Sequence, residues 1–406
     1  MQLLTFLGVF NLETTQFTWQ EKPLLENPSP YVVEALLKFN EIQKISVFLT
    51  PEAEQHKNWK GLQECISKHK KISIEPVPIS SKQTEEELWN LFVKVVDAVP
   101  PNSEIIFDIT HAFRSIPFLA FLVTAFLQKA RSVTVKSVYY GAFDRNQPET
   151  PIIDLTPAIK LLDWLTATEQ FITTGSSINL GNLLSKIQQD FSSQDRQKIT
   201  PPRLLEKLGT SIQDISRSLE LIRSMGVLKE TAKLQKIPAQ ELAKEVGYFA
   251  KPFELLSEQI QQSYGQFALS DPEKLENSQS SLQKQFLLLR WYVKKEQGTQ
   301  AILLAREWLV SARCVAKGMD YLNKGNREQV EDELNQMKGS KPHLTLATAR
   351  TKDDKITLTW SNLIKYRNDI AHAEMRRNSA EATQLQQYVK NKLIQEIETV
   401  FSEFTV

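Results

Sequence analysis

The sequence predicts an α/β domain followed by a part built of helices alone. Three observations lead to this prediction. Residues 1–160 alternate between short apolar runs and segments with helical spacing. The apolar runs are rich in β-branched and aromatic residues, which is typical of parallel strands covered on both faces. Beyond residues 146–157 strand signals nearly vanish, and helical patterns continue to the end of the chain. We therefore expect a Rossmann-like parallel-sheet domain followed by helical domains.

The first part is predicted to contain five strands separated by four helices. The expected strands are residues 3–10, 44–50, 71–79, 103–110 and 132–143, and the expected helices are residues 30–39, 52–69, 84–99 and 115–130. Thr84 is a suitable N-cap for the third helix. The fourth helix is apolar enough to be buried. No G-x-G-x-x-G follows the first strand, so the dinucleotide-binding fingerprint is absent.

The remaining sequence is predicted to form two helical parts. A chain of 406 residues is too long for one ordinary core. Residues 161–278 are expected to form a helical connector, with breaks at "TTGSS", "ITPP" and "KIPAQ". In residues 279–406, a long helical pattern over 280–320 precedes a polar stretch and a final pair of helices. The predicted boundaries are therefore 1–160, 161–278 and 279–406.

Composition excludes several classes of protein. Hydrophobic residues make up 41% and charged residues 24% of the chain, as in globular domains. The net charge of +1 excludes a basic nucleic-acid coat. Cys65 and Cys314 are far apart, which suits a reducing cytoplasm. No apolar run reaches about 18 residues, and the start lacks a basic segment, so we expect neither membrane span nor signal peptide.

The segment "KYRNDIAHAEMRR" (365–377) combines an arginine with one of five histidines. Five helical positions turn a side chain by about 140°, so Arg367 and His372 would not share a helix face. We therefore expect the backbone to break between them, with Asn368 and Asp369 as N-caps. Arg367 would then end one segment, and His372 would lie in the first turn of the last helix.

An arginine and a histidine are sufficient for RNA cleavage without a metal. Histidine exchanges a proton near neutral pH, and arginine offers a charged planar fork to phosphate oxygens. A base can remove the proton of a 2′-hydroxyl, whose oxygen then attacks the adjacent phosphorus. No carboxylate cluster with metal-ligand spacing lies nearby. The alternative is that Arg367 and His372 belong to a merely solvated face.

The turn "DITHAFRS" (108–115) is predicted to bind an anionic ligand. It follows the fourth strand, and ligands of open parallel sheets bind beyond the carboxyl ends of the strands. Its side chains offer hydrogen-bond donors and one phosphate fork, while Asp108 is expected to brace the turn. The predicted contacts are Gly8, Asn11, Thr50, Thr110, His111, Arg114 and Ser115. The alternative is that these polar residues only cap a buried helix.

Several of these stretches resemble a known family. The C-terminal segment resembles the HEPN ribonuclease domain, whose signature is an arginine, about four to six residues, and a histidine, often with a polar residue after the arginine. Here these are Arg367, Asn368 and His372. Residues 108–128, with 46–53 and 137–144, resemble the CARF domain of CRISPR-associated proteins, and 161–175 is similar to the connector of the same proteins. The chain thus resembles the CARF–HEPN ribonucleases of type III CRISPR systems.

This resemblance implies a single-strand RNA endoribonuclease activated by cyclic oligoadenylate in antiviral defence. It implies a metal-independent attack of the 2′-hydroxyl that leaves a 2′,3′-cyclic phosphate, with Arg367, His372 and Asn368 as the catalytic set. The activator is expected to be cyclic tetra-adenylate, with cyclic hexa-adenylate as the alternative, and to be shared across a homodimer. No cofactor, metal or membrane is implied, and the expected location is the cytoplasm.

Two other functions are compatible with the sequence. Residues 210–228 have the pattern of a helix-turn-helix, so the chain could be a CARF-type transcriptional regulator without nuclease activity. The acidic "QDISRS" and the flanking helices favour a packed connector instead. The other possibility is that the N-terminal domain slowly cleaves its own activator.

Overall fold

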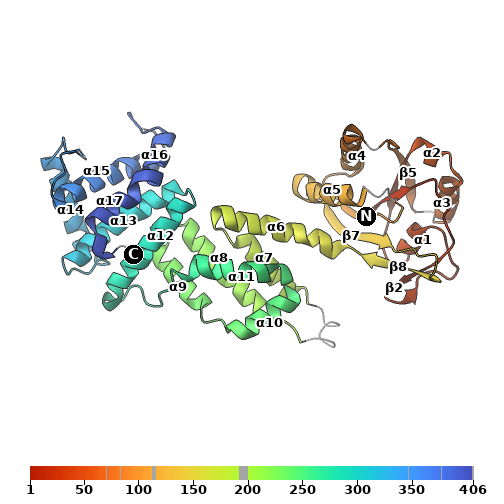
Figure 1. Ribbon diagram of the computed structural model, residues 1–406, viewed down its shortest axis with the longest axis horizontal. Helices are drawn as coiled ribbons and strands as arrows, with labels where there is room; N and C mark the ends of the chain where they lie inside the picture. Colours follow the sequence, from red (N-terminus) through yellow and green to blue (C-terminus); the bar gives the residue numbers. More distant parts are fainter. Residues whose placement is uncertain are drawn as a thin grey trace. The chain divides into compact units, whose positions relative to one another are not determined.

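The computed structural model describes residues 1–69, 71–82, 84–111, 116–191, 200–345, 347–375 and 377–404. These residues form two compact units, Met1–Asp163 and Trp164–Val406 (Figure 1). The first unit contains a sheet with helices, and the second contains helices. None of the helices in the described ranges is both long and apolar enough to cross a bilayer.

An eight-stranded sheet forms the centre of the first unit. Its order is β3-β2-β8-β7-β6-β1-β4-β5. The strands β7, β6, β1, β4 and β5 run parallel, whereas β8 is antiparallel to β7. Since β1 lies between β4 and β6, the direction of winding reverses there. The strands are β1 Gln2–Leu7, β2 Gln16–Trp19, β3 Lys22–Pro23, β4 Lys44–Leu49, β5 Ser73–Pro78, β6 Glu104–Asp108, β7 Thr134–Gly141 and β8 Glu149–Asp154.

Helices cover both faces of this sheet. Leu3 and Leu7 of β1 pack in one core with α1 and α3, whereas Leu4 and Phe6 pack in another with α4 and α5. This alternation follows from the two-residue period of a strand. The helices are α1 Val32–Leu36, α2 Pro51–Glu54, α3 Lys57–Ser67, α4 Glu85–Ala98 and α5 Ile116–Arg131, and α6 Thr156–Thr174 continues into the second unit.

The predicted fold class is confirmed, and each predicted strand and helix of the first unit has a counterpart. Thr84 caps α4, accepting a hydrogen bond from the Glu87 N–H at 3.3 Å. The sequence analysis missed β2, β3 and β8, which are short or antiparallel and lie outside the apolar runs. The prediction of a buried fourth helix was wrong in part. Leu122 and Phe126 of α5 are 46% and 44% exposed, although the Phe92 ring of α4 packs against Phe126.

The second unit is a helical assembly around one large apolar core. Its helices are α7 Ile178–Gln189, α8 Leu205–Glu220, α9 Ser224–Leu234, α10 Ala239–Phe249, α11 Lys251–Gly265, α12 Ser278–Lys294, α13 Gly298–Ala316, α14 Lys324–Ser340, α15 Lys352–Ala371, α16 Ala382–Tyr388 and α17 Ile394–Val400. Three short turns complete it: η2 Leu275–Asn277, the π-helical η3 Val389–Leu393 and η4 Ser402–Phe404. The predicted helical pattern over 280–320 is two helices, and the polar stretch after it includes α14.

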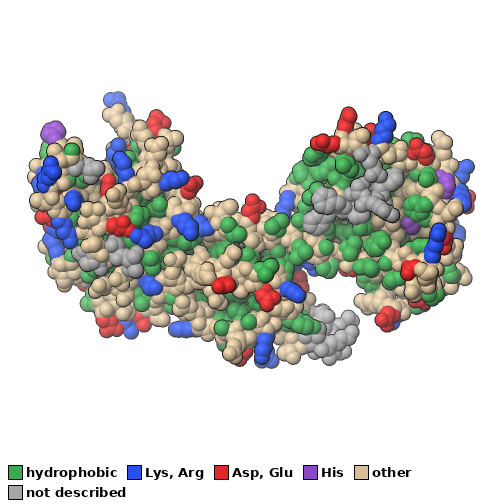
Figure 2. All heavy atoms as spheres, in the orientation of Figure 1, with side chains coloured by type: hydrophobic (Ala, Val, Ile, Leu, Met, Phe, Trp, Pro, Cys, Tyr) green, Lys and Arg blue, Asp and Glu red, His purple; other side chains and the backbone are tan. Residues whose placement is uncertain are grey.

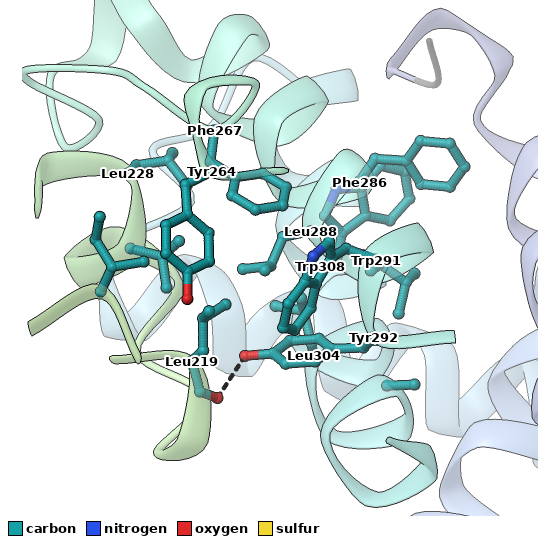
Figure 3. Close-up of a cluster of buried hydrophobic side chains, with 14 of the residues drawn as sticks. Leu219, Leu228, Tyr264, Phe267, Phe286, Leu288, Trp291, Tyr292, Leu304 and Trp308 are labelled. Atoms are coloured by element: carbon teal, nitrogen blue, oxygen red, sulfur yellow. Dashed lines mark hydrogen bonds between the residues drawn. The ribbon is translucent and has the colours of Figure 1, made fainter. Parts of the chain in front are cut away.

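Buried tyrosines join the early and late helices of this unit. The Tyr292 hydroxyl of α12 donates to the Leu219 carbonyl of α8 at 2.6 Å (Figure 3). The Tyr264 hydroxyl donates to the Gly175 carbonyl at 2.6 Å. Burial raises the pKa of Tyr264 to about 12, so this hydroxyl remains a donor at neutral pH. The predicted connector and C-terminal helices thus share one core, and the boundary between them stays a prediction.

Two glycines permit the close approach of α7 and α8. A Cβ atom on Gly181 would lie 2.5 Å from the Gly209 carbonyl oxygen, and one on Gly209 would lie 2.6 Å from the Gly181 carbonyl oxygen. Both obstacles are backbone atoms, which cannot rotate away. Gly247 of α10 differs, because the nearest atom to its Cβ would be 3.8 Å away.

We predict that Gly209→Ala lowers the free energy of unfolding by about 2 kcal/mol, because α7 and α8 must separate. Gly247→Ala should instead raise it by about 0.5–1 kcal/mol, since alanine is the better helix former. Urea unfolding followed by circular dichroism measures both. Equal effects of the two substitutions would contradict the packing of α7 on α8.

Candidate functional site

A fully buried carboxylate organises the end of β6. Asp108 accepts a hydrogen bond from the Thr5 hydroxyl of β1 at 2.6 Å. Its other oxygen accepts from the Thr110 N–H at 3.0 Å and the Thr110 hydroxyl at 2.6 Å. The Gly141 N–H of β7 donates to the Thr110 hydroxyl at 2.8 Å. Asp108 therefore ties the turn to both neighbouring strands, which is the bracing role expected from the sequence.

Among the described residues of this turn, His111 has a buried polar atom without a partner. Its Nε2 is buried and has no hydrogen-bond partner among the described residues. Burial lowers the pKa of His111, and the nearby Asp108 opposes this effect. A buried nitrogen without a partner costs free energy, so it favours a ligand that can complete its hydrogen bonding.

The loop after β1 is held beside this turn. The Phe10 ring lies 5.5 Å from the His111 ring, measured between centroids. The buried Asn58 of α3 donates to the carbonyls of Gly8 at 2.9 Å and Phe10 at 2.8 Å. A Cβ atom on Gly8 would lie 2.6 Å from the Phe10 ring, so this position requires glycine unless the ring moves. The sequence analysis missed Asn58, because nothing in its local pattern marks it.

The structure brings several predicted ligand contacts to one edge of the sheet. Gly8 and Thr50 follow Leu7 and Leu49, which are paired in the parallel ladder of β1 and β4. Thr110 and His111 follow β6 on the other side of β1. Asn11 is exposed in the loop after β1. Arg114 and Ser115 lie outside the described residues.

Two of these hydroxyl groups already have partners. Thr50 is buried and accepts from the Ala53 N–H at 3.3 Å as the N-cap of α2. The Thr110 hydroxyl donates its proton to Asp108. Both residues therefore support the turns at this edge of the sheet, and a ligand would meet them through their remaining lone pairs or backbone groups.

The Arg367–His372 segment lies at the end of α15. The predicted break between the two residues was wrong, because α15 continues through Ala371 and His372 is its C-cap. Asn368 and Asp369 lie inside the helix and are not N-caps, and the next helix begins only at Ala382. Leu363, Tyr366 and Ile370 pack on the core at helical spacing. This burial favours continuation of the helix over the capping preference of asparagine and aspartate.

The helix ends in a strained turn directly after His372. The Ala373 N–H donates to the Ile370 carbonyl at 3.1 Å, and the Glu374 N–H donates to the Asp369 carbonyl at 3.2 Å. This pair of bonds is a Schellman motif, which normally uses glycine as its first left-handed residue. Here Ala373 and Glu374 have φ values of 47° and 66°. Non-glycine residues in this region cost free energy and concentrate at functional sites.

Asp369 anchors the chain that returns from this turn. Its side chain is buried, and one carboxylate oxygen accepts from the Ala380 N–H at 3.0 Å. The eleven-residue separation means that Asp369 closes a loop containing His372. Asp369 is thus a positioning residue for the loop, a role that the sequence analysis did not assign to it.

Arg367 and His372 are both exposed, and Asn368 is partly buried. One Nη atom of Arg367 donates to the Asn368 side-chain oxygen at 3.1 Å, which orients the guanidinium. Because His372 lies five positions after Arg367, at the C-cap of the same helix, helical geometry directs the two side chains about 140° apart. One chain therefore presents the two groups in different directions.

Two groups of side chains pack against α15. The Tyr366 and Tyr388 rings stack with centroids 4.6 Å apart, and the Tyr388 hydroxyl donates to Glu396 at 2.8 Å. Burial raises the pKa of Glu396. On another side, the Arg306 guanidinium lies 5.2 Å from the centre of the Trp360 ring and pairs with Glu331. Arg306 of α13 therefore connects α14, through Glu331, with α15, through Trp360.

The helix-turn-helix pattern corresponds to α8 and α9. Both lysines of α9 are paired, Lys229 with Glu273 at 3.0 Å and Lys233 with Glu230 at 2.8 Å. A helix that reads DNA needs cations directed at phosphates.

Within the described ranges, no group of three or more His, Cys, Asp or Glu side chains is placed to hold a metal ion.

Comparisons with known proteins identify one family model and one curated relative. Residues 160–280 match the family model of the second domain of the CRISPR-associated protein MJ1674. The CRISPR-associated protein MJ1674 of Methanocaldococcus jannaschii is 25% identical over 296 residues, or 72% of this chain. The chain is related to CRISPR-associated proteins. This confirms the kinship expected from the sequence. The chain spans 41% of the length of that curated relative.

A solved structure also matches over nearly the whole chain. It is Csm6 of Enterococcus italicus, bound to cyclic hexa-2′-fluoro-hexa-dAMP. The match covers 99% of this chain and 94% of that chain, with 10% identity and a TM-score of 0.44. This likeness is too weak to assign a ligand or an activity.

Proposed function

We propose that the chain is a single-strand RNA endoribonuclease of type III CRISPR defence that cyclic oligoadenylate switches on. The observation that carries the proposal is the placement of Arg367 and His372, both exposed at the strained end of α15. A kinship with CRISPR-associated proteins supports it. The paired lysines of α9 disfavour the alternative of a DNA-binding regulator.

The reaction needs only groups that this segment supplies. His372 takes the proton of a ribose 2′-hydroxyl, and the 2′-oxygen forms a bond to the adjacent phosphorus. The bond from phosphorus to the 5′-oxygen breaks, the leaving oxygen takes a proton from water, and protonated His372 returns its proton to the hydroxide so formed. Arg367, oriented by Asn368, stabilises the charge that develops on the phosphoryl oxygens. The products carry a 2′,3′-cyclic phosphate and a 5′-hydroxyl.

The proposed active form is a homodimer. One chain directs Arg367 and His372 about 140° apart, so two chains related by a twofold axis would build one composite cleft. An exposed aromatic surface on α4 and α5 supports self-association. It consists of Trp89, Phe92, Val93, Leu122 and Phe126, of which Trp89 is 63% exposed (Figure 2). Contiguous apolar surface of this kind marks interaction sites.

The proposed activator site is the edge of the sheet where β1 and β6 end. The Gly8 loop and the Asp108–His111 turn meet there through the Phe10 and His111 rings. We expect cyclic oligoadenylate to reach His111 Nε2 and the backbone of Gly8, with Asn11 and Thr50 at the rim. Arg114 and Ser115 remain predicted phosphate contacts. The ligand activates the nuclease only through its preference for the active arrangement of the dimer.

We predict that Phe126→Glu converts the dimer into a monomer, because it places a charge in the apolar interface. Ile153→Glu is the matched control, since Ile153 is 42% exposed on β8 outside the aromatic surface. Light scattering at assay concentration measures the mass of each. If the parent protein is monomeric and active, the dimer proposal is wrong. If the Phe126→Glu variant is still a dimer, the dimer interface lies elsewhere.

His372→Ala should abolish RNA cleavage and leave activator binding unchanged, because the two sites lie in different parts of the chain. Arg114→Ala should weaken activator binding about tenfold or more, the value of one charge-assisted phosphate contact. Saturating activator should then restore much of its cleavage. Parallel titrations of binding and cleavage test both assignments. Cleavage by His372→Ala, or an unchanged response in Arg114→Ala, would show the corresponding assignment to be wrong.

Cleavage should persist in EDTA and should fail on DNA, which lacks the 2′-hydroxyl that attacks phosphorus. The measurement is cleavage of unstructured RNA with each cyclic oligoadenylate, followed by analysis of the product ends. Loss of activity in EDTA, or products with 5′-phosphates, would contradict the mechanism.

A further inference from the structure

A pocket between α11 and α12 carries an unbalanced positive charge. Its volume is about 430 Å³. Gln259, Gln262 and Gln266 supply polar, uncharged groups from one side. Arg290, Lys294 and Lys295 supply three cations from the other. No carboxylate lines the pocket within the described part of the chain, so these cations face one another and the amides.

The partners of the three cations leave part of this charge uncompensated. Arg290 pairs with Glu398 of α17 through one Nη atom. The Lys295 ammonium donates only to a neutral group, the Ile172 carbonyl. Burial, and then the charge of Lys294, lower the pKa of Lys295. Lys294 is exposed and makes no hydrogen bond or ion pair with any residue in the described ranges. An anion in the pocket would relieve this repulsion.

The opposite side of α11 shows that this charge is local. A second pocket there, of about 650 Å³, is lined by Glu254 and Glu258, with no lysine or arginine among its described residues. The two pockets share Gln262 and Gln266. The two pockets adjoin along α11, and the cations are gathered in one of them.

We propose that the basic pocket binds the sugar–phosphate backbone of single-stranded RNA, at a distance from the bond that is cut. This inference rests on the proposed ribonuclease function and adds a second binding site for the same substrate. The lysines and Arg290 would neutralise phosphates. The glutamine amides offer both donors and acceptors, which suit ribose hydroxyls and base edges.

An acidic peptide fits the pocket less well than RNA does. Its carboxylates would pair with the three cations. The N–H donors of the glutamine amides would then compete with those cations for the same carboxylates. Trp291 forms part of the lining but is 6% exposed and donates to the Ser263 hydroxyl at 3.3 Å. Its ring therefore belongs to the core in Figure 3 and is not a stacking platform for bases.

The test compares two charge reversals in a background that binds RNA without cutting it. His372→Ala is that background, Lys294→Glu alters the pocket, and Lys324→Glu is the matched control. Lys324 is 89% exposed on α14 and makes only a 3.5 Å pair with Glu328. The readout is fluorescence anisotropy of a labelled, unstructured RNA of about twenty nucleotides over a range of salt concentrations.

We expect Lys294→Glu to weaken RNA binding about tenfold and Lys324→Glu to change it less than about twofold. The slope of log affinity against log salt should fall by about 0.7 for each phosphate that the variant no longer neutralises. With His372 restored, Lys294→Glu should raise KM for the long RNA and leave kcat unchanged. Lys295→Gln provides a second variant with the same expected direction.

Equal binding by the Lys294→Glu and Lys324→Glu variants would overturn the inference even if the parent cleaves RNA. Displacement of the RNA by an equal concentration of polyglutamate would also overturn it, because the pocket would then be a site for acidic peptides. If the parent cleaves no RNA but only Lys294→Glu weakens RNA binding, the pocket assignment stands and the proposed ribonuclease function fails.

Discussion

Both candidate sites lie where a strand or a helix ends. Backbone N–H and C=O groups lose their regular hydrogen-bond partners there, and the need to replace these partners shapes both sites. At the end of β6, the Asp108 carboxylate accepts from Thr5 and from the N–H and hydroxyl of Thr110. At the end of α15, the Asp369 and Ile370 carbonyls accept from Glu374 and Ala373. In each case a buried aspartate holds the polar turn that follows. Replacing either aspartate by alanine would leave the backbone N–H groups of Thr110 or Ala380 without their acceptor, so each turn depends on its aspartate.

The strain at the end of α15 connects the proposed RNA-cleaving site with the proposed dimer. Ala373 and Glu374 hold left-handed conformations at a position that usually has glycine. Such conformations persist only when the surroundings impose them. The Asp369–Ala380 bond and the core beneath Tyr366 provide these surroundings in a single chain. A facing chain in the proposed dimer would add to them, which would couple the shape of the loop to association.

Positive charge is concentrated at one pocket, although the net charge of the whole chain is close to zero. The net charge is +1, yet the pocket beside α12 gathers Arg290, Lys294 and Lys295 without a lining carboxylate in its described part. Elsewhere in the same unit, cations such as Arg306 and Lys229 are matched by glutamates. A nearly neutral chain with one such pocket would bind a polyanion at that pocket, without attracting nucleic acid over its whole surface.

The sequence alone determined the alternation of strands and helices, the parallel sheet, the N-cap at Thr84 and the residue types of both candidate sites, because periodicity and capping are local signals. Tertiary structure decided the rest. The strands β2, β3 and β8 on one side of the sheet exist through pairing, and α15 runs past Asn368 and Asp369 because Leu363, Tyr366 and Ile370 pack on the core. Asn58 reaches the Gly8 loop across about fifty residues of sequence, a contact that no local pattern encodes. The basic pocket forms only when α11 and α12 pack, since the burial of Lys295 depends on neighbours distant in the chain.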